Sequence, residues 1–169
     1  MKKLILLTLL SGCGQEPLVM TLPLKKIEAR FAPNFLDFIE ISKEYGFTPS
    51  FRDIRYMQTD DSIYGEEGTV GMCYSNTTVK REYYSPEHKE DVYIYNEIRI
   101  VSETMLSDLR IDLKEVVYHE LLHCIFKLEH NENNSNDIMY PYVGQSKISV
   151  DQRLRNKLSE IRDGEKEDK

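Results

Sequence analysis

The chain has 169 residues, of which 40% are hydrophobic and 30% charged. This length and composition are typical of a single globular domain with its own hydrophobic core and leave little room for a second one. The 29 acidic and 22 basic residues give a formal net charge of −7 at pH 7. Because such a surface repels phosphate backbones, we expect no nucleic-acid partner.

The first residues form a segment typical of protein export. A basic start precedes a short apolar run and then small residues around Cys13, which is the layout of a secretory signal. The tetrad LSGC at residues 10–13 resembles the lipobox of bacterial lipoproteins, which implies cleavage before a lipidated Cys13. We expect residues 1–12 to be the signal peptide and 13–23 a lipidated tether that holds the protein at the bacterial cell envelope, in the outer membrane or at the cell surface. The alternative is an ordinary cleaved signal peptide with a chance cysteine.

The start of the domain predicts one strand and one helix. Apolar residues alternate with charged ones over residues 27–31, as on a half-buried strand. Pro33-Asn34 then opens an amphipathic helix, and Asp37 would complete a capping box with the asparagine. Gly46 is expected to end this helix.

The middle of the chain predicts further strands. Residues 50–57 and 69–74 are short β-prone runs on either side of a polar loop at 59–68. The strongest predicted strand is DVYIYNEIRIV at 91–101, which is rich in aromatic and β-branched residues. The stretch VKREYYSPEHKE at 79–90 is either a hairpin arm or a loop.

A second helix is predicted from its N-cap at Asp112 to Phe126, with apolar residues at helical spacing. Its end overlaps HELLHCIFKLEH at 119–130, which holds three of the four histidines of the chain. A third helix is expected to begin at Ser149 and to end before a charged tail at 164–169.

The order of these elements predicts a mixed α/β or α+β domain over residues 24–163, with a mixed sheet that packs against helices. The sheet should be mixed because the first two strands are joined through a helix. Cys73 and Cys124 remain in the mature chain, and an exported compartment would permit them to pair. Two buried free thiols would explain the same residues.

The histidines predict a metal centre. Residues four apart share one face of a helix, so His119 and His123 can bind one ion together. H-E-x-x-H is the signature of zinc hydrolases, in which the glutamate, here Glu120, acts as general base. A catalytic zinc takes three protein ligands and a water. Either Glu129 or His130 can supply the third.

This stretch, followed by NDIMYPY, resembles the metzincin metallopeptidases, whose signature is H-E-x-x-H-x-x-G-x-x-H and then a methionine-containing turn. The resemblance implies a twisted mixed sheet of four to five strands, a backing helix, the H-E-x-x-H helix, the Met-turn and a C-terminal helix. It also implies that Met139 supports the metal from below. Tyr142 would line the pocket for the substrate side chain after the cut, as a tyrosine does in matrixin-like members.

The chain departs from the family pattern at two positions. Phe126 stands where the family has the glycine that lets its helix turn. The last histidine also comes one residue late, since the family position falls on Glu129 and the histidine is His130. A one-residue insertion at Phe126-Lys127 would account for the shift and favours His130 as the third ligand.

The sequence thus predicts a monomeric zinc-dependent endopeptidase whose single ion is held by His119, His123 and His130. A protein or peptide substrate would lie along an edge strand, for which residues 69–74 are the candidate. The alternative is a non-catalytic envelope lipoprotein with a structural or vestigial zinc site. A metalloenzyme that acts on something other than a peptide also remains open.

Overall fold

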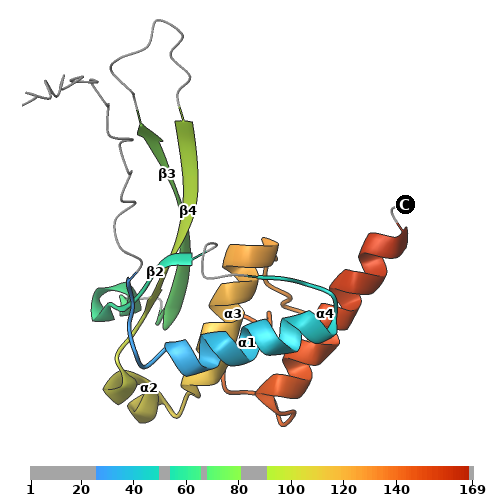
Figure 1. Cartoon of the computed structure of the whole chain (residues 1–169). Helices are drawn as coiled ribbons and strands as arrows, with labels where there is room; N and C mark the ends of the chain where they lie inside the picture. The colour runs from blue at the N-terminus through green and yellow to red at the C-terminus, as the bar shows by residue number, and fades with distance from the viewer. Residues whose placement is uncertain (1–25, 50–53, 66–67, 81–90, 168–169) are drawn as a thin grey trace, which may run out of the picture.

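In a computed structural model, the protein is described over residues 26–49, 54–65, 68–80 and 91–167. These residues form α-helices and one mixed sheet, so the expected α+β class is confirmed (Figure 1). The segment expected to hold the signal peptide, the lipidated Cys13 and the tether lies outside the described residues. Among the described helices, none is long and apolar enough to cross a membrane.

The sheet has the strand order β1-β2-β4-β3. Three strands are of ordinary length, β2 (Ile54–Thr59), β3 (Gly71–Lys80) and β4 (Asp91–Ile100), whereas β1 (Lys26–Ile27) has only two residues. The sheet is therefore smaller than expected. β1 pairs with β2 and β2 with β4 in parallel, while β3 pairs with β4 antiparallel, so the prediction of a mixed sheet is confirmed.

The helix α1 (Ala32–Glu44) begins earlier than predicted. Phe31, expected on a strand, is its buried N-cap residue and makes no side-chain cap. The predicted capping box is wrong because Asn34 already lies within the first turn, where Pro33 is also tolerated. Gly46 follows the helix at φ +89°, a left-handed conformation that suits glycine and ends the helix as predicted.

Two short helical segments were not predicted. The helix α2 (Glu103–Leu109) begins where the hydroxyl of Ser102 accepts a hydrogen bond from the backbone N–H of Met105 at 3.4 Å. A 3₁₀ turn, η1 (Asp61–Tyr64), lies within the expected polar loop. Both are too short to produce a clear helical periodicity in the sequence.

The last helix, α4 (Val150–Glu167), follows Ser149, whose hydroxyl accepts from the N–H of Gln152 at 3.3 Å. The predicted start is thus confirmed. The helix continues through residues 164–167, so most of the stretch expected to be a charged tail is helical.

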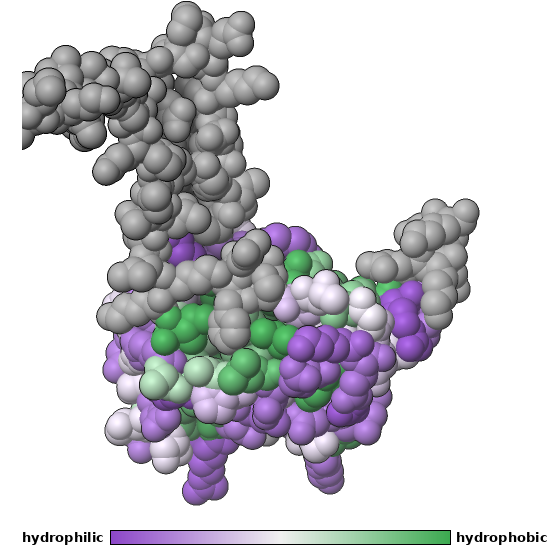
Figure 2. Space-filling view, viewed as in Figure 1, coloured by the Kyte–Doolittle hydropathy of each residue, from purple (hydrophilic) through white to green (hydrophobic). Residues whose placement is uncertain are grey.

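One hydrophobic core joins these elements. The helices α1, α4 and α3 (Leu113–Phe126) pack against one another, and α3 also packs against β3 and β4 (Figure 1). Buried residues of every helix and of β2 and β4 meet in this core, among them Phe35, Met57, Ile98, Leu106, Leu121 and Leu158. The face shown in Figure 2 is largely hydrophilic, with one hydrophobic area near its centre. Because α3 packs against α1, α4, β3 and β4, this helix is fixed on several sides.

Candidate metal centre

The helix α3 carries the first two predicted ligands. Its N-cap is Asp112, as predicted, and the carboxylate accepts from the backbone N–H of Lys114 at 2.8 Å. Most of the helix is buried, and the exposed fraction of both His119 and Glu120 is only 5%. Packing on several sides holds these side chains in place, which a precise site requires.

Three histidine nitrogens meet at one point. The Nε2 atoms lie 3.0 Å apart for His119 and His123, and 3.1 Å from each of these to His130. This spacing suits three ligands of one ion at about 2.0–2.1 Å from each nitrogen. Among the described residues, these three histidines form the group that can hold a metal ion, and Glu129 does not belong to it. The geometry therefore favours His130 over Glu129 as the third ligand.

Hydrogen bonds orient two of the rings. Nδ1 of His119 lies 2.8 Å from the carbonyl oxygen of Ile138, and Nδ1 of His123 lies 2.6 Å from that of Leu128. Because a carbonyl oxygen can only accept, Nδ1 must carry the hydrogen in both rings. Each Nε2 then presents its lone pair to the shared centre, as in metal-binding histidines whose second nitrogen is fixed by the protein.

Burial also keeps these rings neutral. It lowers the pKa of His119 from 6.5 to about 4, against the opposing effect of the Ile138 carbonyl, and it lowers the pKa of His123. The neutral imidazole is the form that binds a metal ion. Protons therefore compete weakly for these two rings near neutral pH.

A left-handed residue brings His130 to the site. Lys127 has φ 56° and ψ 34° and ends α3 directly after Phe126. The glycine of the metzincin signature falls at the position of Phe126, so the left-handed residue of this chain comes one position later. An L-residue in this conformation costs roughly 1–2 kcal/mol. The ammonium of Lys127 donates to the hydroxyl of Ser75 at 3.0 Å and to the side-chain oxygen of Asn96 at 3.1 Å, and these bonds offset the cost. Sequence reasoning placed the insertion here but gave Lys127 no role.

The expected Met-turn is a buried, hydrogen-bonded turn. Met139 is buried, and its N–H donates to the carboxylate of Asp137 at 2.9 Å. The same carboxylate accepts from the side-chain amide of Asn131 at 2.7 Å and pairs with Lys157 of α4 at 2.6 Å. The N–H of Asn131 donates to the carbonyl oxygen of Met139 at 2.9 Å. The turn is thereby tied to the segment that directly follows His130.

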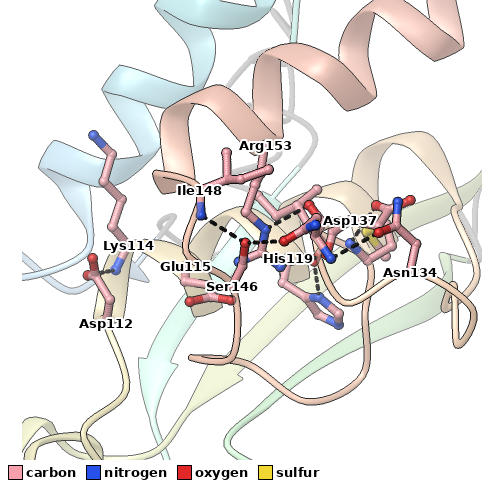
Figure 3. A network of polar contacts seen from close by, with 12 residues as sticks. Asp112, Lys114, Glu115, His119, Asn134, Asp137, Ser146, Ile148 and Arg153 are labelled. Atoms are coloured by element: carbon pink, nitrogen blue, oxygen red, sulfur yellow. Dashed lines mark hydrogen bonds and ion pairs between the residues drawn. The ribbon is translucent and has the colours of Figure 1, made fainter.

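A buried ion pair supports this turn from behind. Arg153 of α4, with an exposed fraction of 2%, pairs with Glu115 of α3 at 2.5 Å. It also donates to the carbonyl oxygens of Asn136 at 3.2 Å and Asp137 at 2.5 Å. Figure 3 shows Arg153 between Glu115 and the loop toward which His119 points. Arg153 thus fixes the backbone next to the carbonyl that orients His119, a role that no local motif indicated.

Glu120 lies beside the three histidines in a tight space. A side chain at Gly71 would place its Cβ 2.7 Å from a Glu120 carboxylate oxygen, so β3 can approach the glutamate this closely only with glycine there. Burial raises the pKa of Glu120 to about 8, while the backbone N–H of Cys73 favours the charged form. A carboxyl whose pKa lies near neutrality suits a group that accepts and returns a proton.

A disulfide links β3 to the site helix. Cys73 of β3 and Cys124 of α3 are bonded, with their Cα atoms 5.6 Å apart and a separation of 51 positions in sequence. The sequence left this pairing open. Closing a loop of this length stabilises the fold by about 4 kcal/mol in the chain-entropy treatment. The cross-link holds the strand against the helix next to Glu120 and His123.

Two neighbouring cavities of about 450 Å³ each flank the centre and share Thr69, Gly71, Glu120 and His130. The first also contains residues of β3 and of the end of α3, among them Met72, Ser75 and His123. The second has apolar walls that include Ile111, Val116, Pro141, Tyr142 and Val143. Tyr142, which the resemblance implies to line a substrate pocket, has an exposed fraction of 64% and lies at this second cavity.

Comparisons of the chain with family models, curated proteins and solved structures find no match. The metzincin resemblance therefore stays a prediction, and the function is inferred from the geometry of the site itself.

Proposed function

We propose that the protein is a zinc-dependent endopeptidase of metzincin type. The observation that carries the proposal is the convergence of three Nε2 atoms within 3.1 Å of one another beside the buried carboxyl of Glu120. Three imidazoles suit zinc among the common divalent ions. The described group contains three potential ligands, which corresponds to a catalytic site with a position left for water and not to a closed structural site of four.

Zinc, when bound, would supply Lewis-acid activation of a water molecule and of the scissile carbonyl. His119, His123 and His130 would hold it. Glu120 would accept the proton of the attacking water and return it to the departing amine, which is the task of a general acid–base group. Met139 would support the histidines from below without contact to substrate.

The substrate would be a protein or peptide bound in extended form beside Glu120. β3 is an edge strand, since it ends the strand order, and it borders both cavities through Gly71. Its backbone can align a peptide by main-chain hydrogen bonds. The second cavity, with Tyr142 at its rim, would take the side chain that follows the cut, and its apolar walls favour an apolar residue.

The place of action would be the bacterial cell envelope. A lipid on Cys13 would anchor the protein in the outer membrane or at the cell surface, and we expect the catalytic domain to act as a monomer. The acidic surface argues against a nucleic-acid partner. Incorporation of a labelled fatty acid into the parent protein but not into Cys13→Ser tests the anchor.

The catalytic role is tested with Glu120→Gln in the zinc-loaded protein. Peptide cleavage is expected to fall by about 10²- to 10⁴-fold because the general base is lost, while zinc content stays at one ion per chain. Glu129→Gln makes the same change in charge outside the histidine group and is the matched control. Full cleavage by Glu120→Gln would contradict the mechanism. Bound zinc with no cleavage by the parent would favour the alternative, a non-catalytic lipoprotein with a structural or vestigial site.

A further inference from the structure

The first cavity beside the histidines has a lysine in its wall. This cavity is lined by residues of β3, of α3 and of the loop that follows α3, among them Gly71, Cys73, Ser75, Lys127 and Leu128. Lys127 is exposed, and it is the only lysine or arginine among the described residues that line the cavity. It lies at the one-residue insertion relative to the metzincin signature, so the signature specifies no residue type at this position.

The ammonium of Lys127 is held at two points. It donates to the hydroxyl of Ser75 at 3.0 Å and to the side-chain oxygen of Asn96 at 3.1 Å. These acceptors are themselves fixed, because the Ser75 hydroxyl donates to the Asn96 oxygen at 2.9 Å and the Asn96 amide donates to the carbonyl oxygen of Cys124 at 3.1 Å. A side chain that is already ordered loses less conformational entropy when it binds a ligand.

The charge of this ammonium has no counterpart in the described part of the chain. Both of its acceptors are uncharged, and an ammonium has three N–H donors, so one donor remains after these two bonds. Among the residues that the structure describes, no carboxylate forms an ion pair with Lys127, although Glu129 lines the same cavity. A positive charge with a donor to spare suits an anionic group that enters the cavity.

The distance between Lys127 and the cleaved bond follows from the strand β3. Gly71 lies against the carboxylate of Glu120, and Ser75, which accepts from Lys127, is four positions further along the strand. At about 3.3 Å per residue, Gly71 and Ser75 are about 13 Å apart. An extended peptide covers this distance in about four residues. Because both side chains have length of their own, a substrate side chain two to four positions from the cleaved bond can reach the ammonium.

We propose that Lys127 is a specificity-determining residue that binds a carboxylate side chain, aspartate or glutamate, two to four positions before the cleaved bond of the substrate. The inference rests on the proposed peptidase function and narrows its substrate class. Since the second cavity takes the side chain after the cut, the first cavity lies on the amino-terminal side of the bond. The chain end on that side is an amine, so the carboxylate must come from a side chain.

The first test is a set of peptide pairs with the same cleavable bond, which carry glutamate or glutamine at one position before the cut. The zinc-loaded full chain is expected to cleave the glutamate peptide with a kcat/KM about 3- to 10-fold higher at one or more of the second to fourth positions, as for a partly exposed charged hydrogen bond. The preference should shrink when the salt concentration is raised from about 0.05 M to about 0.5 M. Equal cleavage of both peptides at all three positions would overturn the proposal.

Lys127→Gln assigns the preference to this side chain. Its amide can still donate to Ser75 and Asn96 but has no charge, so the ratio of kcat/KM between glutamate and glutamine peptides is expected to fall to about 1. Lys127→Arg keeps the charge and should keep a ratio above 1. Lys43→Gln removes a charge from the exposed face of α1, outside the cavity, and is the matched control with the parent's ratio. A parent-like ratio in Lys127→Gln would contradict the assignment.

A binding measurement separates this inference from the proposed function. Fluorescence anisotropy of the labelled peptides with Glu120→Gln is expected to show tighter binding of the glutamate peptide, and the difference should vanish in Glu120→Gln/Lys127→Gln. A parent that binds zinc but cleaves no peptide would remove the proposed function, while this difference in binding would still support a carboxylate site at Lys127. Equal binding of both peptides to Glu120→Gln would overturn that site, even if the parent cleaves peptides. The same result would leave Lys127 with the role of holding the turn alone.

Discussion

Two loops serve the same metal centre and are built in different ways. The loop at residues 136–139 lies behind His119 and is held by the buried side chains of Arg153 and Asp137. The loop at residues 127–130 leads to the exposed His130 and is held by the left-handed Lys127, by the hydrogen bonds of its ammonium and by the bond that the Leu128 carbonyl accepts from His123. Most residues of the first loop are buried in the core, whereas most residues of the second loop are exposed at the surface. Damage to the first should therefore unfold the protein, and damage to the second should mainly weaken the site.

Arg153→Ala should produce the largest effect. It would leave the carboxylate of Glu115 buried without its partner, and the expected loss in free energy of unfolding is about 3–5 kcal/mol. Urea unfolding of the metal-free protein measures this loss directly. The double variant Glu115→Leu/Arg153→Met removes both charges and is the matched control, expected to lose much less. A loss below 1 kcal/mol in Arg153→Ala would show that the first loop does not depend on this ion pair.

The pH dependence of stability should also separate the two loops. Burial lowers the pKa of His119 from 6.5 to about 4 in the folded protein. Between these values the unfolded chain binds a proton at this residue and the folded chain does not. The contribution of His119 is thus complete above pH 6.5 and is lost as the pH falls toward 4, by roughly 3 kcal/mol at most.

This pH effect can be assigned to a residue by substitution. Urea unfolding in the presence of a chelator, at several values between pH 7.5 and 4.5, is expected to show a weaker pH dependence for His119→Gln than for the parent. His130→Gln, on the exposed loop, serves as the comparison and is expected to keep most of the parent's slope. Equal slopes in the parent and His119→Gln would contradict the assignment.

Lys127 should give the smallest effect. Lys127→Ala loses the hydrogen bonds to Ser75 and Asn96 but keeps a side chain in the left-handed conformation, whereas Lys127→Gly loses the same bonds and relieves the conformation. The glycine variant is therefore expected to be more stable than the alanine variant by about 1 kcal/mol. Thermal unfolding of the two variants measures the difference. An alanine variant of equal or greater stability would mean that the turn carries no strain.

The parts of the structure that local sequence determines were predictable. The start of α3 at Asp112, the strand β4 and the pairing of His119 with His123 follow from capping, β-propensity and helical spacing. The same local reasoning failed for α1, since Phe31 fits a strand pattern but packs into the core as an N-cap. Local patterns also missed α2, which is only seven residues long.

The support of the site depends on contacts that no local pattern contains. Arg153 and Glu115 are 38 residues apart in sequence, and Cys73 and Cys124 are 51 apart. Such pairs are set by how the helices and the sheet pack, which single-sequence periodicity does not specify. The third ligand could be predicted from the sequence only in part. A one-residue shift in the motif indicated His130, but the left-handed turn at Lys127 that delivers it comes from tertiary contacts.

The most direct test of the zinc site is the zinc content of the parent protein, His130→Ala and Glu129→Ala, each dialysed against the same low concentration of zinc. The three-histidine site predicts one zinc per chain in the parent and in Glu129→Ala, and a large loss in His130→Ala. Loss of zinc in Glu129→Ala with full retention in His130→Ala would contradict the ligand set. A parent that holds no zinc would contradict the proposal of a zinc peptidase altogether.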